Sequence, residues 1–133
     1  GKLRGLLPFT CRLLGTQRLC DELARFWRAH PPASFYFLPE AVDFCDYLRS
    51  RKLRLRYLDE VIAYERATLE LERACIGIPP PQHVHFHHDP TALLAALAQG
   101  RHPRAIRARP CIATGTRDAH GQTAWTLEDS AAA

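Results

Sequence analysis

Apolar residues recur at helical intervals through the first half of the chain. Leu19, Leu23, Phe26 and Trp27 predict the buried face of a helix that begins near Thr16 and ends before the two prolines that follow it. A second helix is predicted next, with a proline in its first turn. The residues that define it are Pro39, Val42, Phe44, Cys45 and Leu48.

The most regular helical pattern covers residues 57–75, where two apolar stripes run about 100° apart. Glu65 and Glu72 fall between these stripes, so both carboxylates are predicted to point inward. Burying an unpaired carboxylate costs several kcal/mol, so each needs a partner, and the arginines of segment 49–56 are the nearest candidates. A structural salt bridge, a groove that faces a partner and a paired acid or metal site all remain open.

The second half of the chain has the pattern of a small mixed unit. Alternating residues predict a strand at 83–87, and Asp89 followed by Pro90 predicts the start of a helix that ends at Gly100. A hairpin turn at residues 118–121 then joins two further predicted strands, at 110–116 and 123–127.

A run of three prolines separates the two halves, because consecutive prolines cannot continue a helix and form a stiff, extended connector. We therefore expect an α+β fold in which an N-terminal helical bundle is followed by a small β-α-β-β domain docked on it. The predicted divisions are a helical domain at 1–76, a connector at 77–81, a small domain at 82–127 and a flexible tail at 128–133.

Three histidines alternate along the first predicted strand. His83, His85 and His87 would share one face, while Val84 and Phe86 would face the core. If the strand lies at a sheet edge, this histidine face is a candidate peptide-binding surface, since an edge strand can accept a peptide by strand addition. The alternative is a metal site, because imidazoles at this spacing can converge on one zinc ion.

Composition narrows the partner class. The chain has 133 residues, a net charge of +4 and no apolar run near the ~20 residues that a membrane helix needs. Its basic residues gather in segments 49–56 and 101–109, which favours an acidic partner, whether nucleic acid, peptide or protein. The five cysteines are odd in number and lack a C-x-x-C pair, so we expect reduced core thiols in a cytoplasmic protein.

Sequence templates for catalysis are missing. The chain contains no phosphate-binding G-x-x-x-x-G-K-[ST] or G-x-G-x-x-G pattern and no G-x-S-x-G pattern. It also lacks the E-x-x-H pairs typical of di-iron helical bundles. We therefore interpret the chain as a binding module that is not an enzyme by itself.

Two segments resemble a known family. Residues 38–48 and 57–65 are similar to the partner proteins of multinuclear non-heme iron-dependent oxidases, which act in ribosomal-peptide pathways such as methanobactin biosynthesis. Tyr57, Leu58 and Glu65 match the family pattern, and the mixed half is similar from the first strand to the hairpin that contains a Trp. The resemblance covers about residues 35–127.

The resemblance implies a heterodimer in which a separate barrel enzyme holds the iron and this chain carries no cofactor. This subunit would recruit a precursor peptide whose cysteine is then oxidatively modified. For the contact with the oxidase we expect a surface formed by Arg54, Arg56, Tyr57, Tyr64 and Glu65.

Two other functions remain open from the residues. In the first, a DNA-binding regulator, the arginines of segment 49–56 would contact phosphates and Tyr57 would stack on bases. In the second, a small histidine-rich metal-binding protein, His83, His85 and His87 would be the ligands.

Overall fold

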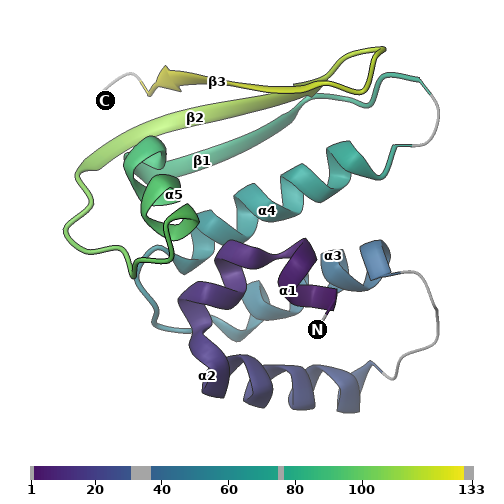
Figure 1. Ribbon diagram of the computed structural model, residues 1–133, viewed down its shortest axis with the longest axis vertical. Coiled ribbons are helices and arrows are strands. Elements are labelled where there is room, and N and C mark those ends of the chain that lie inside the picture. The colour runs from purple at the N-terminus through teal and green to yellow at the C-terminus, as the bar shows by residue number, and fades with distance from the viewer. Residues whose placement is uncertain (1, 31–36, 75–76, 131–133) are drawn as a thin grey trace.

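The computed structural model describes residues 2–30, 37–74 and 77–130 and has a mixed α/β fold. The strands form an antiparallel sheet in the order β1-β2-β3, and Figure 1 shows the helices grouped on one side of this layer. The prediction of helices combined with a small antiparallel sheet is confirmed at this level. In chain order the elements are α1 (Lys2–Leu6), α2 (Pro8–Ala29), α3 (Phe37–Arg51), α4 (Leu58–Glu72), β1 (Gln82–His88), α5 (Pro90–Ala98), β2 (Ala108–Arg117) and β3 (Thr123–Asp129).

The first long helix differs from its prediction in two ways. It starts at Pro8 and is interrupted at Gly15, whose φ of 78° is left-handed, so the start predicted at Thr16 is only the point where the helix resumes. The predicted core position of Trp27 is wrong, because this side chain is 41% exposed and donates its Nε1–H to Glu40. Phe26 points into the core, and Trp27, the next residue, lies about 100° further round the helix and therefore points outward.

Helix α4 lies between the sheet and the group formed by α1, α2 and α3 (Figure 1), and it packs against α2, α3, β1 and β2. Its last-turn carbonyls would otherwise have no intrahelical donor. Arg117 from β2 supplies one, since its Nη1 donates to the carbonyls of Leu71 at 3.1 Å and Ala74 at 2.8 Å. A positive charge at this end also complements the helix dipole.

Helix α5 begins and ends at the predicted signals. The Asp89 carboxylate accepts the N–H of Thr91 at 3.2 Å, and Pro90 takes the first helical position. At the other end Gly100 has a φ of 77°, its N–H bonds to the carbonyl of Leu97, and the next N–H reaches back to Ala96. This pair of hydrogen bonds is the Schellman arrangement that favours glycine after a helix.

The strands confirm the predicted alternation. On β1 the side chains of Val84 and Phe86 are buried, and they share one continuous core with residues of the helices. Strand β3 extends further than predicted, because Glu128 and Asp129, assigned to the flexible tail, continue it. Asp129 is also held by Arg109, whose Nε lies 2.8 Å from its carboxylate.

Trp125 attaches the outer strand to the helices. It pairs with Gly115 across β2 and β3, and its ring reaches over that glycine to Tyr64 on α4, with 5.0 Å between the ring centroids. A Cβ atom added at Gly115 would lie 2.7 Å from the indole ring. The glycine therefore leaves the space that the indole occupies.

We predict that Gly115→Ala destabilises the fold by about 1–3 kcal/mol, because the added methyl group overpacks this contact. Gly5→Ala is a matched control, since nothing lies within 4 Å of a Cβ added there. Urea denaturation of both variants measures the difference. Equal midpoints for Gly115→Ala and the wild type would contradict the role given to Trp125.

Candidate functional site

The candidate site is the outer edge of β1 and the exposed face of the sheet beside it. Strand β1 is the first strand of the order β1-β2-β3, so no described strand lies beyond it. His83, His85 and His87 are all exposed on the face opposite Val84 and Phe86, as predicted.

The histidine face continues onto the neighbouring strands. The register places His83 next to Thr114, and Nδ1 of this histidine lies 3.1 Å from the threonine hydroxyl. The same register places His85 next to Ile112, which in turn pairs with Glu128 on β3. The exposed face therefore combines imidazoles, hydroxyls and one carboxylate, a surface that can donate and accept hydrogen bonds.

The backbone of β1 has an outer edge that can pair with another chain. At its end, the N–H of His88 turns away from β2 and donates to Glu60 at 3.2 Å, while the N–H of Asp89 bonds to Arg107. Because backbone groups alternate along an antiparallel strand, the N–H groups of Val84 and Phe86 also point away from β2. Both residues are only 2% exposed, so an extended peptide would have to displace the groups that cover this edge before it could hydrogen-bond to them.

A buried junction closes one end of this edge. Glu60 is only 4% exposed, and its Oε2 lies 3.0 Å from Nδ1 of His88. Tyr57 packs edge-on against the His88 ring, with 4.7 Å between centroids, and its hydroxyl accepts the N–H of Ile106. The pairing of Glu60 with His88, which joins α4 to β1, was not predicted from the sequence.

The predicted oxidase-contact surface is only partly exposed. Arg54 and Arg56 are exposed and Tyr64 is half-buried, but Tyr57 and Glu65 are 6% and 5% exposed. The contact with the oxidase stays a prediction, and in this structure Tyr57 and Glu65 do not form part of the exposed surface. Both side chains instead accept backbone N–H groups inside the molecule.

Glu65 points inward as predicted, but its partners are different. Its two carboxylate oxygens accept the N–H groups of Phe9 at 3.0 Å and Thr10 at 2.6 Å, in the first turn of α2. Burial outweighs these hydrogen bonds and raises the pKa of the Glu65 carboxyl above its usual range. The matching prediction for Glu72 is wrong, since this residue is exposed near the end of α4.

An arginine of segment 49–56 does pair with a buried carboxylate, although not with Glu65. Arg51 contacts Glu22 on α2, with 3.0 Å between Nε and Oε2, and Glu22 is 5% exposed. The sequence carried a signal for this carboxylate, because it lies three residues after Leu19 and four before Phe26, on the buried face.

The cysteines divide into two groups among the described residues. Cys11, Cys45 and Cys111 are buried, and burial raises the pKa of Cys11 to about 11 and that of Cys45 to about 12. These thiols are protonated at neutral pH and are weak nucleophiles. Cys20 is exposed, which corrects its expected core position, and Cys75 lies outside the described residues.

The metal hypothesis has no geometric counterpart in the described parts of the chain. There, no three histidine, cysteine or acidic side chains are grouped so that they could hold a metal ion. Along β1 the three histidines occupy every second position, which separates neighbouring Cα atoms by about 6.6 Å.

Comparisons with known proteins do not assign the chain to a family. No family model, curated protein sequence or solved structure matches it. Within 2–30, 37–74 and 77–130, none of the helices has the length and apolar character needed to cross a membrane.

We predict that Glu65→Ala destabilises the fold by about 2–4 kcal/mol, because it leaves two buried N–H groups without an acceptor. Glu65→Gln keeps an acceptor and should cost less. Urea denaturation measures both, and Glu72→Gln, at an exposed position, is the control.

The same variants test the pH dependence. A carboxyl whose pKa is raised by folding stabilises the protein fully below the ordinary carboxyl pKa, and this contribution is lost as pH rises through the folded-state value. The free energy of unfolding of the wild type should therefore fall relative to that of Glu65→Gln as the pH is raised from about 4 to about 7. A relative gain over this range would show that the pKa is lowered.

Proposed function

We propose that this chain is a non-catalytic subunit that docks on a multinuclear non-heme iron oxidase and recruits a ribosomally made precursor peptide. The observation that carries the proposal is the unpaired outer edge of β1, with its exposed row of His83, His85 and His87. An edge of this kind binds an extended peptide through backbone hydrogen bonds, while side chains on the adjoining face select the sequence.

The two parts of the chain would divide the work. In this proposal the helical part, residues 1–76, contacts the oxidase through exposed groups such as Arg54 and Arg56. The β-α-β-β part, residues 82–127, holds the peptide. The iron belongs to the partner enzyme, and the cysteine that is oxidised belongs to the peptide, in a cytoplasmic complex.

The charge of the two sheet edges favours β1 as the peptide site. Strand β3 carries Glu128, which would repel an acidic peptide, besides Asp129, which is paired with Arg109, whereas β1 contains no carboxylate.

Co-expression with the oxidase tests the docking part of the proposal. We expect the two chains to copurify in a one-to-one complex, with iron in the oxidase and no turnover by this subunit alone. Recovery of this chain only as a free monomer would contradict the proposal. Duplex DNA binding that weakens steeply with salt would instead favour a DNA-binding regulator.

Hydrogen exchange tests the peptide site in the same complex. On addition of the precursor peptide, the amides of Val84 and Phe86 should become protected, because strand addition pairs them. His85→Glu should weaken binding of an acidic peptide by about tenfold, roughly 1.4 kcal/mol. Thr126→Glu, which adds the same charge on β3, is the matched control, and protection of β3 amides instead would place the peptide there.

A further inference from the structure

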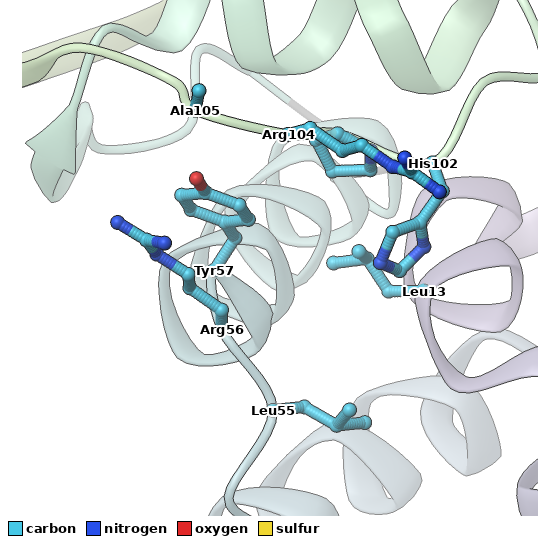
Figure 2. Close-up of a pocket in the computed structure, with 8 residues that line it drawn as sticks. Leu13, Leu55, Arg56, Tyr57, His102, Arg104 and Ala105 are labelled. Carbon is cyan, nitrogen blue, oxygen red and sulfur yellow. The ribbon is translucent and has the colours of Figure 1, made fainter.

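A basic pocket lies between two loops that are distant in sequence. The loop before α4 and the loop between α5 and β2 enclose a cavity of about 230 Å³. Apolar groups form part of its wall, namely Leu13, Leu55, Pro103 and the ring of Tyr57. Figure 2 shows the Tyr57 ring between the Arg56 side chain and the pair formed by Arg104 and His102.

Among the residues that the structure describes, the basic groups of this pocket have no acidic partner. No residue that lines the cavity carries a carboxylate, and neither Arg56 nor Arg104 forms an ion pair within the described residues. Other arginines of the basic segments 49–56 and 101–109 are neutralised, for example Arg49 by Asp59 and Arg109 by Asp129. Uncompensated positive charge in a concave wall focuses the field and attracts anions.

The backbone around the pocket is held in an unusual conformation. Tyr57 has a φ of 71° and Ala105 a φ of 51°, both left-handed and both without the freedom of glycine. A hydrogen bond links the two positions, because the N–H of Ile106, the residue after Ala105, donates to the Tyr57 hydroxyl at 3.2 Å. Left-handed non-glycine residues cost of order 1–3 kcal/mol each and cluster where a binding surface must be held in shape.

We propose that this pocket binds a small organic anion, with a carboxylate or phosphate head group held by Arg104 and His102, on the side of the Tyr57 ring away from Arg56. Guanidinium groups form charge-assisted hydrogen bonds with both kinds of oxyanion. The apolar body of the ligand contacts Leu13, Leu55 and the Tyr57 ring. The proposal does not depend on peptide recruitment at β1, since it uses none of that site's residues.

Titration followed by NMR tests the site on the full chain. The probes are benzoate, phenyl phosphate, inorganic phosphate and the neutral amide benzamide, and the ring resonances of Tyr57 and His102 report binding. We expect at least one of the two organic anions to saturate the shifts, at a concentration about tenfold below benzamide and inorganic phosphate. The tighter of the two identifies the head group, and saturation by neither overturns the proposal.

A pair of arginine variants separates a site from general attraction by charge. Arg104→Gln should weaken binding of the preferred anion about tenfold, because it removes a charge-assisted hydrogen bond. Arg107→Gln removes the same charge from an exposed residue outside the pocket and should change binding less than about twofold. An equal loss in both variants would overturn the proposal, and a melting curve for each shows that folding is retained.

Discussion

The packing of the molecule depends on buried carboxylates of α4 that accept backbone N–H groups from other elements. Glu65 accepts hydrogen bonds from two backbone N–H groups in the first turn of α2. Glu60, five residues earlier, accepts one from the last residue of β1. At about 100° per residue these two side chains leave the helix in directions roughly 140° apart. A single helix thereby fixes α2 on one side and the sheet on another, with polar contacts that specify distance and register more narrowly than apolar packing alone.

The same arrangement explains why the sheet has a free surface. All of the apolar residues that β1 contributes to the core face α4, so the other face of the strand needs no cover and remains exposed. At the end of the strand, Glu60 closes the outer edge by binding His88.

Local signals in the sequence predicted the parts of the fold that depend on neighbours in the chain. The alternation in β1 and the Asp89 and Gly100 ends of α5 need only a few adjacent residues, and the structure has them as predicted. The acceptor role of Glu65 could not be predicted, because its partners Phe9 and Thr10 lie more than fifty residues away. The basic pocket was missed for the same reason, since it exists only where two distant loops meet.

The end of α4 is completed by a residue that is synthesised much later. Arg117 donates to the carbonyl of Leu71, in the last turn of α4, and follows it by 46 residues. On the ribosome, the helix therefore emerges well before the side chain that completes its last turn. Until β2 has been translated and has docked, these carbonyls lack the donor that Arg117 supplies in the folded molecule.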